Sequence, residues 1–213
     1  MVDFSIVDPS ASRARSEATI QQHLETGDVR AAVTLTLRLY GAEVLGFLGA
    51  LTKDSDAAAD VFSIFCEDVW RGLPAFRWES SLRTWLYVIA RRARSRYGRQ
   101  GHERKRLPLD EALHEVQAEV RTQTATFQRT ETKSAVRELR AALTSEEQSL
   151  LMLRVDRSLP WTDIARVMLS DEAETDEAAI KREAAACRKR FERAKERLKH
   201  LAREQGLLKD PKS

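Results

Sequence analysis

The sequence predicts an all-α protein made of two small helical domains joined by a linker. Leu, Ala, Arg and Glu dominate the 213 residues, and only 8 glycines and 5 prolines interrupt them, a composition that favours helices. Apolar residues recur at helical spacing in several segments, and no segment shows the alternation of a strand. The length suits one large domain or two small ones, and a polar stretch near the middle of the chain favours two.

The first domain is predicted over residues 10–100 and holds three helices, each with apolar residues at helical spacing behind a side chain that can cap its start. Gly72 and Pro74 end the second of these helices, because both residues interrupt regular helix geometry. The predicted capping residues are, in chain order, Asp28, Asp56, and either Ser80 or Ser81.

A linker is predicted over residues 101–133, and a second domain over residues 134–205. The linker is polar, with weak apolar periodicity that suggests a partly helical segment. In the second domain Ser145 and Gln148 form a capping-box pattern, and a short helix carries Pro160 in its first turn. With the long basic helix that follows, these segments form a helix-turn-helix pattern.

The last helix is predicted to start at Thr175, where Asp176 and Glu177 favour a helix N-terminus, and to run to about Glu204. Its apolar stripe packs on the preceding helices in one interpretation and forms a coiled-coil dimer in the other, although Ala at two stripe positions argues against a strong zipper. The stripe consists of Ile180, Ala184, Cys187, Phe191, Ala194, Leu198 and Leu201.

Positive charge is concentrated in two blocks, although the formal net charge of the chain is only +3. From Arg71 to Arg106 eleven basic residues face two acids, and from Ala178 to Arg203 ten face three. An acidic stretch separates the blocks. Two such blocks, each at the end of an apolar helix, predict two contacts with a polyanion rather than two solvated helix faces.

The segment "FRWESSLRTWLYVIARRARSRYGR" places aromatic residues beside arginines. Arginines hold phosphates and aromatic rings stack on unpaired bases, so this segment predicts a surface for an opened DNA strand. Core packing is the favoured interpretation for Trp85, and Trp78 is either a base contact or an anchor to the fold. The residues predicted to face inward on this helix are Leu82, Trp85, Leu86, Ile89 and Ala93.

No enzyme is predicted from this sequence. The four histidines are scattered, no metal-binding or phosphate-loop motif occurs, and we expect neither a metal nor a cofactor. Cys66 and Cys187 are expected to be reduced structural thiols.

No apolar run approaches the roughly 18 residues of a membrane span, and no secretory signal is visible. We therefore expect a cytoplasmic, nucleoid-associated protein without a membrane partner.

Several motifs together resemble the extracytoplasmic-function sigma factors, the small members of the bacterial sigma-70 family of promoter-recognition subunits of RNA polymerase. "PAFRWESSLRTWLYVIAR" closely resembles their region two, and "DAAADVFSIFCEDVWRGLPAF" looks like their polymerase-binding helix. "ALTSEEQSLLMLRVDRSLPWTDIARVM" and "RFERAKERL" resemble the two ends of region four. The resemblance covers about two thirds of the chain, in the family's order and spacing.

The resemblance implies core RNA polymerase and promoter DNA as partners, with a separate anti-sigma factor as a further candidate. It implies opening of the minus-ten element by Trp78, Arg83, Tyr87, Arg91, Arg92, Arg94 and Arg96. Together with the charge pattern, it implies reading of the minus-thirty-five element by Lys181, Arg182, Arg188, Lys189, Arg190 and Arg193. Polymerase binding would use Asp60, Val61, Phe65, Glu67 and Trp70, whose apolar members face either the core or the interface.

The sequence also departs from the family pattern. The Gln-Glu pair of the polymerase-binding helix is replaced by Ser63 and Ile64, and about a dozen extra residues, including an acidic insertion at 170–178, lengthen the turn of the helix-turn-helix. These departures favour an alternative function, a sigma-like DNA-binding transcriptional regulator that does not initiate by itself, whereas the intact motif at 76–91 favours a sigma factor. A structural or dimerising helical protein is a third hypothesis, supported by the last stripe alone.

Overall fold

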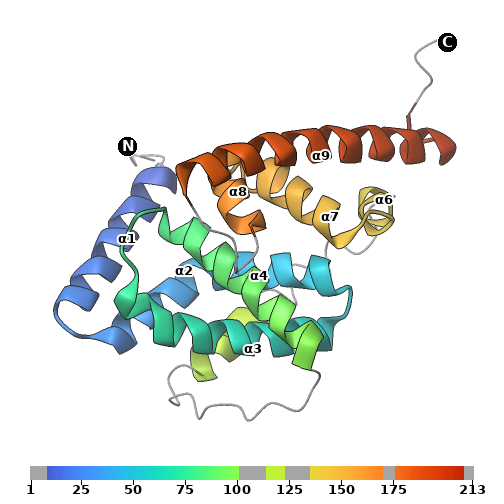
Figure 1. The fold of residues 1–213 in the computed structure, drawn as a ribbon. Helices are drawn as coiled ribbons and strands as arrows, with labels where there is room; N and C mark the ends of the chain where they lie inside the picture. Colours follow the sequence, from blue (N-terminus) through green and yellow to red (C-terminus); the bar gives the residue numbers. More distant parts are fainter. Residues whose placement is uncertain (1–8, 101–113, 123–134, 170–175, 209–213) are drawn as a thin grey trace, which may run out of the picture.

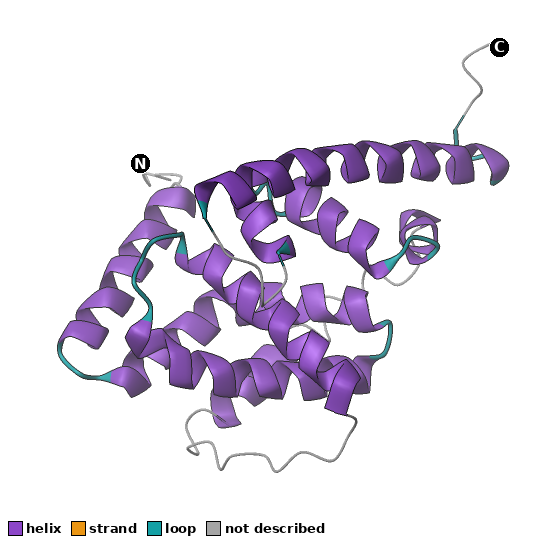
Figure 2. Ribbon diagram, viewed as in Figure 1, coloured by secondary structure: helices purple, strands orange, loops and turns teal. Residues whose placement is uncertain are grey.

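The computed structural model describes residues 9–100, 114–122, 135–169 and 176–208, and every regular element in these ranges is a helix (Figure 2). The fold class predicted from the sequence is therefore confirmed. The helices are α1 (Pro9–Glu25), α2 (Val29–Thr52), α3 (Ser55–Gly72), α4 (Leu82–Gln100), a helix at 114–122, α6 (Ala135–Ala141), α7 (Ser145–Leu151), α8 (Trp161–Met168) and α9 (Glu177–Glu204), with a 3-10 turn at Leu73–Ala75 and a π-helical turn at Met152–Asp156.

Helix α2 is the central helix of a first unit, which we define as α1 to α4 together with the helix at 114–122. It packs against α1, α3 and α4, and its large side chains Tyr40, Phe47 and Leu48 are fully buried. Among the described helices α2 alone is long and apolar enough to cross a membrane by length and composition. Its apolar side chains are instead part of the core of this unit, as expected for the core helix of a helical bundle.

Two of the predicted helix caps are correct, and two lie one or two residues away from the predicted positions. Asp28 accepts a hydrogen bond from the Ala31 N–H at 3.0 Å, and Ser81 accepts one from the Thr84 N–H at 3.0 Å, as predicted. The cap of α3 is Asp54 rather than Asp56, because Asp54 accepts hydrogen bonds from the backbone N–H groups of the first turn, in which Asp56 itself lies.

The capping box of α7 is formed by Thr144 and Glu147, one residue before the predicted pair. The Thr144 hydroxyl accepts from the Glu147 N–H at 3.3 Å, and the Glu147 carboxylate accepts from the Thr144 N–H at 2.8 Å. Gln148 faces inward and donates to the Leu143 carbonyl at 2.9 Å, so its amide is not available for a capping box with Ser145.

The helix at 114–122 lies within the predicted linker and packs on the first unit. Val116 and Val120 are buried in its core, and a Cβ added to Gly41 would lie only 2.9 Å from a Val120 methyl. Gly41 thus permits this close approach, since any larger residue would collide with Val120. The predicted linker positions Leu113 and Phe127 lie outside the described residues.

A second unit, which we define as α6 to α9, lies on one side of the first, with α9 running along its outer edge (Figure 1). Asp176 caps α9 by accepting from the Ala179 N–H, so the helix begins at Glu177, two residues after the predicted start at Thr175. Helix α8 packs on α4 and α7 packs on α2. One continuous apolar cluster joins α2, α3 and α4 to Leu150, Ile164 and Cys187 of the second unit.

Candidate nucleic-acid interface

The start of α4 carries a cluster of three aromatic rings. The ring of Phe76 lies with its centroid 5.0 Å from that of Trp78 and 5.0 Å from that of Trp85. All three rings are partly buried. Trp78 has a positive φ of 59°, a backbone conformation that costs free energy for a bulky residue and that is concentrated at functional sites. The cluster therefore holds Trp78 at the surface in a fixed, strained position.

The buried face of α4 differs in part from the predicted one. Leu82, Leu86 and Ala93 are buried as expected, whereas Trp85 and Ile89 are only half-buried. Their predicted places in the core are taken by Tyr87 and Ala90, which are completely buried. The buried face is rotated about the helix axis relative to the predicted face, because α4 is covered on two sides. Helices α2 and α3 cover one side, and α8 covers the other.

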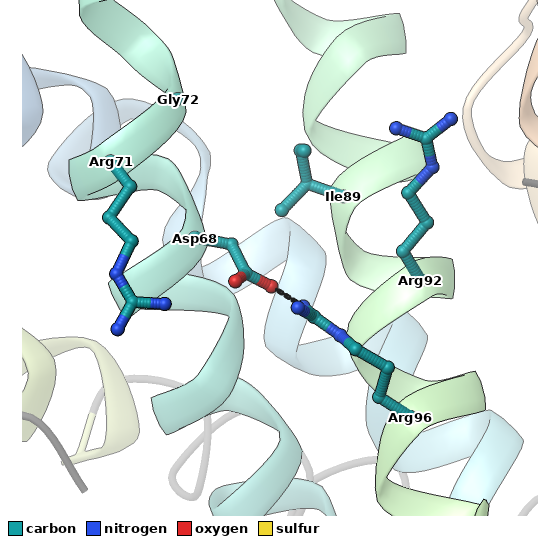
Figure 3. Close-up of a pocket in the computed structure, with 6 residues that line it drawn as sticks. All are labelled: Asp68, Arg71, Gly72, Ile89, Arg92 and Arg96. Carbon is teal, nitrogen blue, oxygen red and sulfur yellow. Dashed lines mark hydrogen bonds and ion pairs between the residues drawn. The ribbon is translucent and has the colours of Figure 1, made fainter.

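The arginines of α4 occupy different environments along the helix. Arg92 and Arg99 are exposed, while Arg91, Arg94 and Arg96 are half-buried. Arg96 forms an ion pair with Asp68 of α3 (Figure 3). The part of α4 from Arg92 onward therefore presents positive charge to solvent beside α3.

A cavity of about 420 Å³ lies between α3 and α4, and the Arg96–Asp68 pair forms part of its wall (Figure 3). Arg71, at the end of α3, and Arg92 line it from opposite helices. The lining holds three guanidinium groups and one carboxylate, and Arg71 pairs with Glu67 outside the lining. The remaining positive charge favours an anionic group such as a phosphate. The remaining lining residues are Gly72 and Ile89.

Arg83, Tyr87 and Arg91, which the sequence assigns to DNA, are held by other parts of the protein in this structure. Tyr87 is fully buried, its ring 5.0 Å from that of Phe47 in an edge-on arrangement. Arg91 Nη1 lies 2.6 Å from Met168 Sδ at the end of α8. Tyr87 is thus not presented to solvent, and Arg91 is half-buried, whereas Arg92 and Arg99 are exposed.

Glu43 belongs to the site through its contacts with α4, although it is absent from the residues predicted from the sequence. Its Oε1 accepts hydrogen bonds from Arg83 Nε at 2.6 Å and from the Tyr87 hydroxyl at 2.7 Å. Burial alone would raise the pKa of Glu43, but the hydrogen bonds from Arg83 and Tyr87 and the nearby guanidinium groups hold it below its ordinary value. Glu43 is the single acid in the apolar α2, and an isolated buried carboxylate requires such partners, a signal that could have pointed to it.

The residues predicted to bind polymerase divide into two groups on α3. Val61 and Phe65 are fully buried and Glu67 is buried beside Arg71, with 3.8 Å between their charged atoms. Asp60 and Trp70 are half-buried. The apolar residues at positions 61 and 65 thus face the core, which leaves Asp60, Trp70 and their neighbours for any contact with a partner.

On α9 three basic residues form a stripe directly opposite the buried face. Arg182, Lys189 and Arg193 are exposed and follow helical spacing. Lys181 pairs with Glu177 at 2.7 Å, and the Arg188 guanidinium lies 5.9 Å from the centre of the Trp161 ring. Arg190 turns instead toward α7 and forms ion pairs with Glu146 and Glu183. Of the acidic insertion, residues 170–175 lie outside the described part of the chain.

Among the described residues, no three His, Cys, Asp or Glu side chains gather as metal ligands. Cys66 and Cys187 are free thiols and are buried. Burial raises the pKa of each thiol to about 12, which keeps both in the unreactive protonated form at neutral pH.

Comparison with known proteins identifies the region that carries this site. Residues 36–104, which run from α2 to just beyond α4, match the family model described as Sigma-70 region 2. The RNA polymerase sigma factor YlaC of Bacillus subtilis (strain 168) is 28% identical to this chain over 133 residues, which cover 62% of the chain and 76% of that protein. The family match therefore includes the aromatic cluster, Glu43 and every predicted minus-ten residue.

Proposed function

The chain belongs to the sigma-70 family, and we propose that this sigma factor of the extracytoplasmic-function type binds core RNA polymerase and opens promoter DNA. A sigma factor acts in transcription initiation on chromosomal DNA, so we assign it to the cytoplasm and the nucleoid. We expect no catalysis by the chain itself. A separate anti-sigma protein remains a candidate partner.

The observation that carries the proposal is the fixed aromatic cluster at the start of a basic helix. Stacking is worth about 1–3 kcal/mol per base, comparable to the cost of removing one base from a duplex. Trp78 is partly exposed and held in place by Phe76, so its ring is available to a base without the cost of ordering it. Arg92 and the cavity beside it lie further along the same helix and would hold phosphates of the opened strand.

For the polymerase contact, the outer stripe of α3 is the proposed surface. Asp60 and Ile64 lie one turn apart on one side of the helix, ahead of the cavity residues Asp68 and Arg71. Val61 and Phe65 support this stripe from within the core. The contact would therefore be largely polar, with Ile64 as its apolar centre.

For the upstream promoter element, the exposed stripe of α9 is the proposed reader. Its three basic residues have no ion-pair partner among the described residues, in contrast to Arg190. A helix that presents several basic side chains on its open face fits the major groove. Arg188 and Lys181 flank the stripe and complete the proposed contact.

Reconstitution of transcription tests the proposal. Purified protein is added to core polymerase with fragmented chromosomal DNA of the source organism, and promoter-dependent transcripts are mapped. Permanganate footprinting at a mapped promoter then compares the wild type with Trp78→Ala, and Trp78→Phe, which keeps an aromatic ring, serves as the matched control. We expect a weaker bubble for Trp78→Ala alone, because stacking acts only on unpaired bases. An unchanged bubble would remove Trp78 from DNA opening.

One observation favours the second candidate, a sigma-like regulator that does not initiate by itself. Ser63, which replaces a polar residue of the family pattern, is buried and donates to the Ala59 carbonyl at 3.1 Å. Ile64 beside it is half-buried. The surface of α3 is thus less polar than the family pattern implies. Binding to promoter DNA without transcripts in the same reconstitution would support this candidate.

A further inference from the structure

The carboxylate of Glu43 lies where α2, α4 and the second unit meet. Besides its hydrogen bonds from Arg83 and Tyr87, its Oε1 is 3.9 Å from Nε of Arg157. Arg157 follows directly after the π-helical turn of the second unit, and its guanidinium extends over Gly46 of α2. A single carboxylate therefore interacts with one arginine from each unit.

Arg83 in turn is held by both units. Its Nε donates to Glu43 at 2.6 Å, and its Nη1 donates to the backbone carbonyl of Arg157 at 2.9 Å. Only 16% of its side chain is exposed. An arginine binds a phosphate in bidentate fashion through two N–H groups of its guanidinium. In Arg83 one of these groups already donates to a protein carbonyl, and the guanidinium is largely shielded from solvent.

We propose that Glu43 is a positioning residue for Arg83, and that Arg157 withholds Arg83 from DNA until the second unit moves away. After that movement, Arg83 keeps its Nε bond to Glu43 and directs both terminal nitrogens toward a phosphate of the opened strand. The inference rests on the proposed function of α4, and it adds a residue outside the predicted DNA-binding set together with the contact that controls it.

Two further contacts support this arrangement. Arg91, one turn beyond Tyr87, is covered by Met168 of α8, and burial lowers the pKa of Arg91 although the nearby Glu146 acts in the opposite direction. Covering this guanidinium is therefore electrostatically unfavourable, and its release favours departure of the second unit. The docked contact is also held rigidly on its own side, because Arg154 donates to the Leu159 carbonyl at 3.0 Å and Ser158 has a φ of 55°.

Binding of single-stranded DNA by the full chain tests the proposal. The probe is a fluorescent DNA strand of mixed sequence and about 12 nucleotides, and its anisotropy is measured with wild type and Arg157→Ala. We expect Arg157→Ala to bind about threefold to fivefold more tightly, because loss of the ion pair with Glu43 favours departure of the second unit, and with it of the carbonyl at position 157 that holds Arg83. An increase in affinity would be diagnostic, since removal of a positive charge by itself weakens DNA binding.

Arg197→Ala is the matched control for charge. Arg197 pairs with Glu147 at 3.6 Å within the second unit and forms no hydrogen bond or ion pair with the described residues of α4, so its removal changes net charge equally without releasing Arg83. We expect its affinity for the strand to equal that of wild type or to fall slightly. An Arg157→Ala affinity no higher than that of Arg197→Ala would overturn the withholding role.

Glu43→Gln, made in the Arg157→Ala background, tests the positioning role. The amide preserves the volume of the side chain and an acceptor but removes the charge that orients Arg83. We expect the slope of log affinity against log salt concentration to fall by about 0.7, the value for one phosphate on a single strand, while circular dichroism stays unchanged. An unchanged salt slope would overturn the positioning role, because a purely structural effect of Glu43 does not alter the number of phosphates contacted.

Small-angle X-ray scattering of the protein without DNA or polymerase separates this inference from the proposed function. We expect a larger radius of gyration for Arg157→Ala than for wild type and Arg197→Ala. If Arg157→Ala has a larger radius of gyration but no variant binds DNA, the Arg157 contact is supported, whereas the proposed use of α4 for DNA is contradicted. An unchanged radius together with unchanged DNA binding would overturn the contact as a controlling element.

Discussion

Glu43 shows how a charged residue is stabilised inside an apolar helix. Its side chain is only 16% exposed, yet hydrogen bonds from Arg83 and Tyr87 keep it ionised. A hydrogen bond to a charged group contributes about 1.5–3 kcal/mol, which offsets much of the cost of burying the carboxylate. The same bonds fix the direction of two side chains on α4.

Replacement of Glu43 by glutamine should therefore change how stability depends on pH. Because the pKa of Glu43 is lowered in the folded protein, its ionised form stabilises the fold above pH 4.5, and this contribution is lost as pH falls through the folded-state pKa. We expect Glu43→Gln to be about 2 kcal/mol less stable than wild type at pH 7, with a gap that narrows below pH 4.5. Urea unfolding at several pH values measures this difference in the free energy of unfolding. A difference that does not change with pH would contradict the expected ionisation of Glu43.

At the residue scale, the sequence predicts what depends on near neighbours. Asp28 is the predicted cap, and Ser81 is one of the two predicted alternatives for its helix, because a cap acts on N–H groups two or three residues away. The DNA contacts of Tyr87 and Arg190 stay predictions, and the structure adds partners that the sequence does not reveal, Glu43 for Tyr87 and Glu146 for Arg190, each 44 residues away. Such partners follow from tertiary packing, which no local pattern contains.

At the scale of the element, Gly41 and Gly46, two of the three glycines of α2, have different surroundings. A Cβ at Gly41 would lie 2.9 Å from a Val120 methyl of the helix at 114–122, whereas at Gly46 the nearest atom, from the flexible Arg157 side chain, is 3.9 Å away. The branched Val120 side chain has little rotational freedom. The two positions therefore form a natural matched pair.

We expect Gly41→Ala to destabilise the protein by about 1–3 kcal/mol through overpacking. Gly46→Ala should instead stabilise it by about 0.5–1 kcal/mol, since alanine loses less conformational freedom in a helix. Thermal unfolding of both variants gives the comparison. Equal stabilisation by both would mean that the helix at 114–122 does not pack on α2 as described.

The open face of α9 leads to a second prediction for an element. Alanine at Arg182, Lys189 or Arg193 should each reduce the salt slope of binding to duplex DNA by about 0.9. Arg190→Ala should leave the slope unchanged and reduce stability instead, because Glu146 and Glu183 lose their common partner. Anisotropy at several salt concentrations measures the slope, and a slope that changes for Arg190→Ala alone would reverse the assignment.

The elements themselves follow from the sequence more fully than their contacts do. Apolar spacing predicted α2, α3, α4 and α9, since a helix that buries one face must repeat that face along its length. The packing of the helix at 114–122 could not be predicted, because it depends on the absence of a side chain at Gly41, far away in the sequence. The cover that α8 places over α4 depends likewise on tertiary contacts.

At the scale of the whole molecule, the two units share one apolar core. The cluster passes without interruption from α2, α3 and α4 to Leu150, Ile164 and Cys187. Each unit also contains one buried thiol, Cys66 in the first and Cys187 in the second. The cysteines therefore give a separate measure of unfolding for each unit within the intact chain.

We expect pulsed thiol labelling in increasing urea to give the same midpoint for both cysteines, because loss of either unit exposes the apolar surface of the other. Mass spectrometry of the two cysteine peptides distinguishes the sites. Arg157→Ala should lower the midpoint for Cys187 relative to that for Cys66. A lower midpoint for Cys187 already in the wild type would show that the units unfold independently.

The packing of Val120 against Gly41 also sets a length scale. With the helix at 114–122 fixed on the first unit, only residues 123–134 connect it to α6. A chain spans at most about 3.6 Å per residue, so twelve residues allow the start of α6 to travel no further than about 45 Å from Thr122. If the proposed function is correct, α4 and α9 hold two promoter segments at once. The distance between these segments cannot exceed the span of residues 123–134 plus the dimensions of the two units. A glycine in the middle of a core helix thereby helps to determine the spacing of the DNA sites that one molecule can bridge.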